Sequence, residues 1–171
     1  MSLKSRFDKF VDERLLPYVF RVSEQPMLFI ELLNANKLFQ EGMRIDGNVQ
    51  GFRISLGRVY LVYIIFWHIV IVPPALVFHE FLAKVDCHLL ILIAVFFTGL
   101  FFAIFSIFNE YLHERMALKT IKEAWINHFP HFKYEQHARE VAQIYSKALE
   151  EEIHHKDMRL YILNNMVAEK G

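Results

Sequence analysis

Two uncharged apolar runs decide the fold of this chain: VYLVYIIFWHIVIVPPALVF at residues 59–78 and LLILIAVFFTGLFFAIFSIF at residues 89–108. Each has twenty residues, and an α-helix of that length is about 30 Å long, which matches the hydrocarbon core of a bilayer. A pair of buried core helices is the alternative, but the rest of a 171-residue chain is too short to cover both all round. We therefore predict two membrane-spanning helices.

Ten residues, 79–88, separate the two runs. Because this connection is so short, we expect the two helices to form a tight antiparallel hairpin. Lys and Arg number nine in residues 1–58, one in the loop (Lys84) and nine in residues 109–171. Segments rich in Lys and Arg stay on the cytoplasmic side of a membrane. We therefore expect a cytoplasmic (inner) or equivalent membrane, with both termini cytoplasmic and the loop outside.

The predicted fold class is an all-α integral membrane protein with three regions. Residues 1–57 form cytoplasmic or interfacial amphipathic helices, residues 58–109 form the transmembrane hairpin, and residues 110–171 form a cytoplasmic helical hairpin. Apolar residues at helical spacing predict a first helix at 3–16, which Pro17 ends because proline lacks the N–H that a helix interior needs.

The segments next to the apolar runs carry further helix signals. A second N-terminal helix is expected from about residue 23 to residue 40, before Gly42. On the C-terminal side, Pro130 predicts a break, and a last helix follows from about 133 to 167. Its apolar stripe, centred on Leu149, is longer than a two-helix hairpin can cover, which implies a partner helix.

Composition excludes several classes of protein. The chain is 54% hydrophobic with only 11 Gly and Pro together, so it is not a disordered or collagen-like protein. Lys and Arg equal Asp and Glu at 19 each, which leaves no basic field for nucleic acid. The single cysteine, Cys87, rules out an internal disulfide framework.

A few polar residues interrupt the apolar runs. His68 lies in the middle of the first run, where a titratable group suggests an ion or proton path, together with Glu110 and Glu114 just beyond the second run. A neutral imidazole bonded to a neighbouring helix is the alternative for His68. The helical phase predicts that the two glutamates point inward. For them, the alternative to an ion or proton path is pairing with a basic residue.

The second run carries a helix-packing pattern. Gly99 and Ala103 are four residues apart, with Thr98 and Ser106 beside them, and small residues at this spacing let two membrane helices approach closely. The pattern favours helix packing over a water-lined pore.

Two Glu-x-x-His motifs suggest one metal hypothesis. Glu110 and His113 form the first motif, and the second combines Glu151 or Glu152 with His154 or His155. This spacing holds metal ions in di-iron bundles, so a transition metal is one hypothesis, although the helical phase points the second motif away from the apolar face. The alternative is a solvated charged face, and no cofactor is predicted.

No catalytic motif is present, so the favoured function is not enzymatic. We expect a small two-pass protein that anchors, assembles or regulates a larger membrane complex through helix–helix contacts. Its predicted partners are the lipid bilayer and other membrane subunits or copies of itself. The first alternative is a homo-oligomeric channel or transporter lined by His68, Thr98 and Ser106, and the second is a metal enzyme at the membrane surface.

Overall fold

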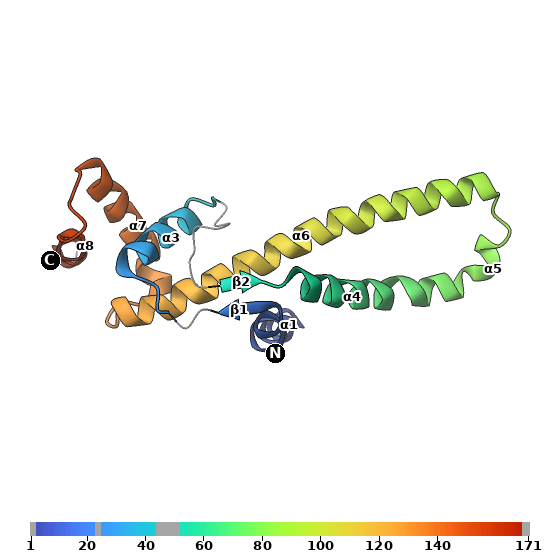
Figure 1. The fold of residues 1–171 in the computed structure, drawn as a ribbon, viewed down its shortest axis with the longest axis horizontal. Coiled ribbons are helices and arrows are strands. Elements are labelled where there is room, and N and C mark those ends of the chain that lie inside the picture. Colours follow the sequence, from blue (N-terminus) through green and yellow to red (C-terminus); the bar gives the residue numbers. More distant parts are fainter. Residues whose placement is uncertain (1–2, 23–24, 44–51, 169–171) are drawn as a thin grey trace. The chain divides into compact units, whose positions relative to one another are not determined.

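The structure, a computed structural model, describes residues 3–22, 25–43 and 52–168. It is mostly helical (80%), and two of its helices are long and apolar enough to cross a membrane. These are α4 (Leu56–Val77) and α6 (Cys87–His128), which correspond to the two predicted runs (Figure 1). The predicted helical class with two apolar helices is thus confirmed.

The chain divides into two compact units. The first contains Met1–Arg21 and Ile54–His113, and the second contains Val22–Arg53 and Glu114–Gly171. The N-terminal part of the chain therefore contributes to both units, and the long helix α6 belongs to the first up to His113 and to the second beyond it.

A two-stranded sheet, which the sequence did not predict, lies where the chain passes between the units. Its strands are β1 (Phe20–Val22) and β2 (Phe52–Ile54). Next to the sheet, the Ser55 N–H donates a hydrogen bond of 2.9 Å to the Val19 carbonyl. This bond fastens the chain before α4 to the N-terminal segment.

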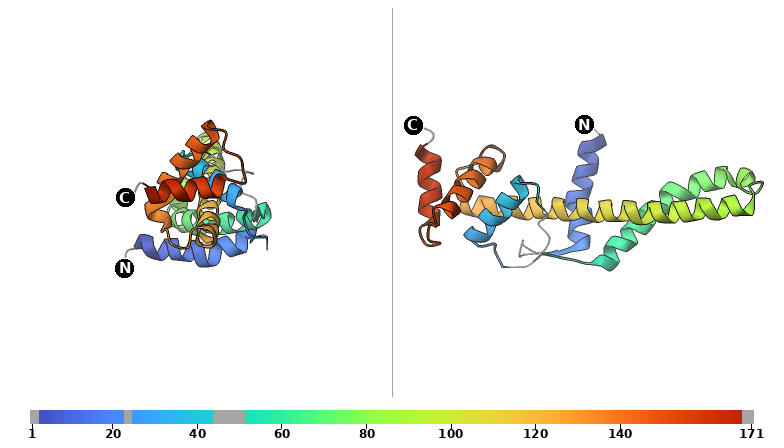
Figure 2. Two further views of the ribbon diagram at one scale, coloured as in Figure 1. Left: turned by 90° about the vertical axis from the view of Figure 1, so that its left-hand side faces the viewer. Right: turned by 90° about the horizontal axis from the view of Figure 1, so that it is seen from above.

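The first unit is built on α4 and the first part of α6, which run antiparallel (Figure 1) and are joined through the short helix α5 (His79–Leu82). Pro73 and Pro74 lie inside α4, which continues to Val77. Proline removes backbone donors from a helix and bends it, and α4 curves along its length in Figure 2.

The N-terminal segment of the first unit is helical from Leu3 to Val19. It consists of α1 (Leu3–Phe10), a π-helical turn η1 (Val11–Leu15) and α2 (Leu16–Val19). The predicted end at Pro17 is wrong. Pro17 instead lies in the first turn of α2, directly after the π-helical turn η1, and the helix continues past it to Val19.

The second unit packs three further helices with the last part of α6. They are α3 (Phe29–Gln40), α7 (Tyr134–Glu150) and α8 (Met158–Ala168). α7 contacts both α3 and α8 (Figure 2). The predicted break after α6 is confirmed, because α6 ends at His128, two residues before Pro130.

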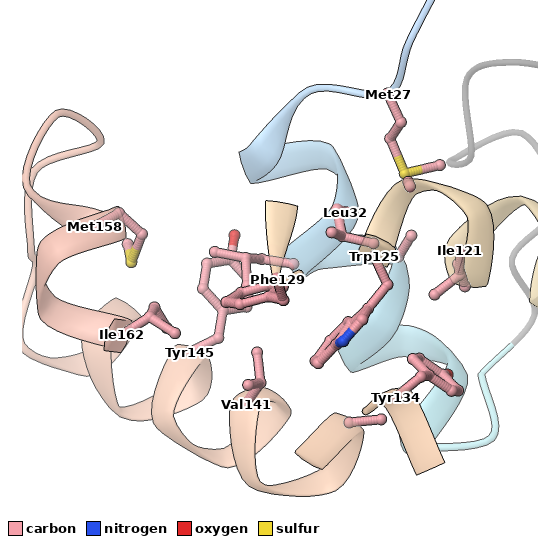
Figure 3. Packing of buried hydrophobic residues seen from close by; sticks show 14 of the residues in the cluster. Met27, Leu32, Ile121, Trp125, Phe129, Tyr134, Val141, Tyr145, Met158 and Ile162 are labelled. Carbon is pink, nitrogen blue, oxygen red and sulfur yellow. The ribbon is translucent and has the colours of Figure 1, made fainter. Parts of the chain in front are cut away.

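Trp125 lies in the core of the second unit (Figure 3). Its ring contacts Phe129 and Tyr134 at centroid distances of 4.5 and 5.2 Å. Its indole N–H donates a hydrogen bond of 2.7 Å to the Phe132 carbonyl, so the buried polar atom is satisfied. Burial also raises the pKa of the Tyr134 hydroxyl above its usual value of 10.0.

The apolar stripe of α7 is covered within the chain. Ala138, Ala142 and Tyr145 are buried in the core, whereas Leu149, the predicted centre of the stripe, is exposed. α3 and α8 supply the cover, and the Asn36 amide of α3 donates a hydrogen bond of 2.7 Å to the Ala138 carbonyl. The part of the stripe from Ala138 to Tyr145 is therefore covered by this chain itself.

The predicted single helix over 133–167 is wrong, because α7 ends at Glu150. The Ile153 N–H bonds back to the Ala148 carbonyl at 3.0 Å, and Glu152 takes a φ of +54°. This is a Schellman cap, in which the left-handed position is usually glycine. α3 ends in the same way with Gly42 at φ +67°, which matches the predicted end before this glycine, whereas the predicted start near residue 23 is wrong because α3 begins at Phe29.

Candidate functional site

Aromatic rings hold α4 against α6 in the part of the hairpin nearest the start of α4. Tyr60 stacks on Phe105 with centroids 4.2 Å apart, and Tyr63 lies 4.9 Å from Phe101. Trp67 meets Phe101 edge-on at 5.3 Å. Aromatic pairs at these distances stabilise a contact beyond the area they bury. They fix the two helices in an antiparallel register.

Tyr63 also ties the helices together through a polar bond. Its ring is buried, and its hydroxyl donates a hydrogen bond of 2.7 Å to the Phe101 carbonyl of α6. A hydroxyl in apolar surroundings needs such a partner, because leaving it unpaired costs free energy. Tyr63 is thus both an apolar contact and a tether.

The outside of the hairpin is apolar and uncovered. Only 11% of the most apolar 18-residue stretch of α4 is buried, and 6% of that of α6. A core helix of a soluble protein would instead be buried on most of its surface. The exposed side chains include Leu61, Ile65, Phe66, Ile69, Leu92, Val95, Phe96 and Phe102.

His68 and Thr98 each bond to their own helix. The Nδ1 atom of His68 lies 2.8 Å from the Ile64 carbonyl, a contact that involves neither a neighbouring helix nor a carboxylate. The Thr98 hydroxyl donates a hydrogen bond of 2.8 Å to the Ala94 carbonyl. Both side chains are exposed on the outside of the hairpin.

The small-residue face of α6 is open. Gly99, Ala103 and Ser106 are exposed, and a Cβ atom placed on Gly99 would meet no atom within 4 Å. α4 instead packs on the phenylalanine face described above. Close packing on Gly99 and Ala103 is therefore not a contact within this chain and stays a prediction about contacts with another helix.

Glu110 and Glu114 are exposed, so the predicted inward position of these carboxylates is wrong. The buried residues of this part of α6 are Leu112 and Met116. Leu112 lies nine residues before buried Ile121, which is half a turn away round the helix at 100° per residue. The buried face of α6 thus changes sides along its length, which a phase counted from Ile121 misses.

The first Glu-x-x-His motif has structural partners. His113 is half-buried, its Nδ1 lies 2.9 Å from the Asn109 carbonyl, and its ring meets Phe20 of β1 edge-on at 5.6 Å. The ring contact between His113 and Phe20 holds strand β1 against α6. Its partner in the motif, Glu110, is exposed and takes part in other interactions.

The second motif is not on a helix. Glu152 is the cap residue after α7, and His154 and His155 lie in the turn before α8, all three exposed. The Nδ1 atom of His154 accepts a hydrogen bond of 3.2 Å from the Lys156 N–H. A side-chain pair three apart points to one side only in a helix, so the geometry that the di-iron hypothesis assumes is missing here.

A different trio has metal-ligating atoms close together. In the part of the chain that the structure describes, the group that could share one ion is Asp86, Cys87 and His88, all exposed, with ligand atoms within 4.8 Å of one another. Asp86 already caps α6 by accepting a bond of 2.8 Å from the His88 N–H. This group was not predicted as a metal site. The signal in the sequence is that three adjacent residues at the start of a helix all have side chains that can bind a metal ion.

The N-terminal segment is fastened to the start of α4. The Arg58 guanidinium donates a hydrogen bond of 2.8 Å to the Tyr18 carbonyl and lies over the Tyr18 ring at 5.2 Å. Together with the bond from Ser55 to Val19, these contacts fix α2 beside the first turn of α4. The attachment lies at the N-terminal end of the first apolar run, because Arg58 is the charged residue directly before Val59.

No family model, no curated protein and no solved structure matches the chain.

Proposed function

We propose that this chain is a two-pass membrane protein that anchors its folded second unit at the cytoplasmic surface, as an anchoring or assembly subunit of a larger membrane complex. The observation that carries the proposal is the apolar, uncovered exterior of α4 and α6. In water, so large an apolar surface would drive association, because its burial is worth about 25 cal/mol per Å². Lipid removes that penalty.

The polar atoms of the hairpin support the same placement. Hydrocarbon offers no hydrogen-bond partners, so every polar group in it needs one inside the protein. The Tyr63 and Thr98 hydroxyls meet this need through carbonyl groups of the hairpin, and so does one ring nitrogen of His68, Nδ1. The hairpin can therefore enter a bilayer with these three groups paired.

The charge distribution supports the orientation. The loop between the helices carries one basic residue, Lys84, whereas nine lie before the first run and nine after the second. The proposal places both termini, and with them the second unit, on the side where Lys and Arg are retained.

The subunit role has a narrower basis. The second unit closes its own core, so its α7 stripe gives no reason to expect a partner. The open face of α6 around Gly99 is the surface that favours a helix from another subunit, since small residues allow close approach. Assembly is therefore proposed within the membrane.

Labelling of single cysteines tests the orientation. Cys87 is exposed in the loop and is the sole cysteine of the chain. In intact bacterial cells, a maleimide that cannot cross membranes is expected to label Cys87. The matched control, Cys87→Ser with Gln143→Cys on the exposed side of α7, should be labelled only after the cells are opened. Equal labelling of both positions in intact cells would overturn the orientation.

Assembly is tested by the mass of the protein in mild detergent after expression at its native level. A closed oligomer, or a second polypeptide in fixed ratio, should be lost in Gly99→Ile and kept in Leu92→Ile, a conservative change at an exposed position of the same helix. A single monomeric chain in the unchanged protein would contradict the subunit role while leaving the membrane anchor intact.

A further inference from the structure

We propose that α1 is an interfacial helix that binds anionic phospholipid, with Phe7 and Phe10 among the lipid chains and the basic residues around them at the headgroups. The inference rests on the proposed membrane hairpin, and it adds a lipid-binding surface at the N-terminus. Four observations within the first unit carry it.

The first observation is where the N-terminal helical segment is attached along the proposed membrane span. α2, which continues α1 through η1, is bonded to Ser55 and Arg58 at the start of α4. The uncharged run of α4 begins at the next residue, Val59. A segment fastened at the end of a membrane span lies at the depth of the headgroups, where the hydrocarbon gives way to water.

The second observation is the direction of α1. Figure 2 shows α1 crosswise to α4 and to the first part of α6, in the same unit. If the hairpin crosses the bilayer, a helix crosswise to it at the headgroup level runs along the membrane surface. This is the placement of interfacial amphipathic helices.

The third observation is an apolar surface that the unit leaves uncovered. Val11, Leu15 and Val19 are buried, whereas Phe7 is 54% exposed and Phe10 is 57% exposed. The two phenylalanines are three residues apart in α1 and so lie on neighbouring positions of its surface. Phenylalanine is one of the residues that form the apolar face of interfacial amphipathic helices.

The fourth observation is charge, which selects the kind of lipid. Residues 3–22 contain five basic side chains and three acidic ones, a net charge of +2. Arg6 and Lys9 flank the phenylalanines and are exposed. The ion pair of Lys9 with Glu13, at 3.8 Å between exposed groups, is weak and leaves Lys9 able to meet a phosphate. A phospholipid with net negative charge satisfies both the apolar and the basic side chains.

Spin labels read the depth of single side chains and test the inference. In a Cys87→Ser background, the chain carries one cysteine label at position 7, 10, 13 or 92 and is reconstituted in vesicles of phosphatidylcholine with phosphatidylglycerol. Collisions with oxygen report lipid, and collisions with a water-soluble nickel chelate report water. Position 13 is the control in the same segment, because Glu13 is exposed, and position 92 is the control in the hairpin.

The expected result is a higher ratio of oxygen to nickel collisions at positions 7 and 10 than at position 13. The ratio at 7 and 10 should fall when phosphatidylglycerol is omitted and when Arg6→Gln and Lys9→Gln are combined. A water-like ratio at 7 and 10, or shielding from both reagents as a covering protein would give, overturns the inference. An unchanged ratio without phosphatidylglycerol overturns the choice of anionic lipid.

The same experiment separates this failure from failure of the proposed function. If positions 7 and 10 are water-like while position 92 is lipid-like, the hairpin spans the membrane and only the interfacial helix is wrong. If position 92 is also water-like, the proposed membrane hairpin itself is wrong, and the inference fails with it.

Discussion

The two units of this chain place their apolar side chains in opposite ways. In the second unit, Trp125, Phe129 and Ile162 are buried in a closed core. In the first unit, Leu92, Phe96 and many of their neighbours point outward. This difference is what the proposed membrane hairpin predicts, although α6 takes part in both units. Five predictions test this difference between the units.

The largest effect is expected for Trp125→Ala, which empties the core of the second unit. Removing a buried tryptophan costs about 3–5 kcal/mol of the free energy of unfolding, and here the bond to the Phe132 carbonyl is lost as well. Chemical unfolding of the full chain in detergent, followed by circular dichroism, measures the change. Ile126→Ala, at the exposed neighbour, should change stability by at most about 0.5 kcal/mol. Equal effects at the two positions would contradict the core described here.

The second-largest effect is expected for a charge on the exposed surface of α6. It should depend on whether the position lies in the proposed membrane span or in the second unit. Leu92 and Ile126 are exposed to similar extents, 66% and 68%, on the same helix. Leu92→Arg is expected to disfavour membrane insertion, by less than the roughly 3 kcal/mol of an arginine at the helix centre because position 92 is near the end of the run, whereas Ile126→Arg should be neutral. The fraction of protein that resists alkaline carbonate extraction is the measurement. Loss of insertion in both variants would contradict the comparison.

The helix caps of the second unit offer a matched pair of smaller changes. Glu152 and Gly42 take the same left-handed backbone, with φ of +54° and +67°. Glu152→Gly should stabilise the unit by about 1 kcal/mol, and Gly42→Glu should destabilise it by a similar amount, since only glycine adopts this conformation without strain. Thermal unfolding of both variants tests the pair. A destabilising Glu152→Gly would contradict the cap.

Removal of one hydroxyl from the hairpin should have a modest effect. Tyr63→Phe keeps the ring against Phe101 and Phe105 but deletes the hydrogen bond to the Phe101 carbonyl. Side-chain hydrogen bonds between membrane helices are worth about 0.6 kcal/mol on average. Unfolding in lipid bicelles measures the change, with Tyr60→Phe as a control that leaves this hydrogen bond in place. A Tyr63→Phe variant as stable as the unchanged protein would show that the bond contributes nothing.

The smallest effect at neutral pH is expected for Tyr145→Phe in the core. Burial raises the pKa of the Tyr145 hydroxyl above its usual value of 10.0. The unfolded chain therefore loses this proton first, so stability is retained below pH 10 and falls as the pH rises through the folded pKa. Unfolding measured from pH 8 to pH 11 should show less alkaline loss in Tyr145→Phe than in the unchanged chain. Identical pH profiles would contradict this role of burial.

Much of the fold follows from local signals in the sequence. The two runs without charge predict α4 and α6, and Pro130 predicts the break after His128. Gly42 likewise marks the end of α3. In each case the signal is local: an unbroken apolar run indicates a long helix, and a single proline or glycine indicates where a helix ends.

Other features depend on contacts between distant segments, which local patterns do not contain. The end of α7 has no glycine or proline: Glu152 adopts a conformation that its residue type does not indicate. The cover of α7 by α3 joins residues about a hundred positions apart, as in the bond from Asn36 to Ala138. An uncovered stripe was therefore predicted where the chain covers itself.

The candidate sites were the least predictable part of the molecule. The helical phase of Glu110 and Glu114 predicts an inward position only if one face is buried along the whole helix, but a 42-residue helix meets different neighbours along its length. Similarly, a Glu-x-x-His spacing has meaning only where the backbone is helical, and at Glu152 it is not. By contrast, His68 needed no tertiary partner, because its own helix supplies the carbonyl.

The most direct test of the central claim is photocrosslinking in a lipid bilayer from two positions on α6. A benzophenone amino acid replaces Leu92 in one protein and Ile126 in another, and mass spectrometry identifies what each attaches to. We expect phospholipid adducts at position 92 and none at position 126. The same adducts at both positions, or adducts to protein in place of lipid at position 92, would contradict the account.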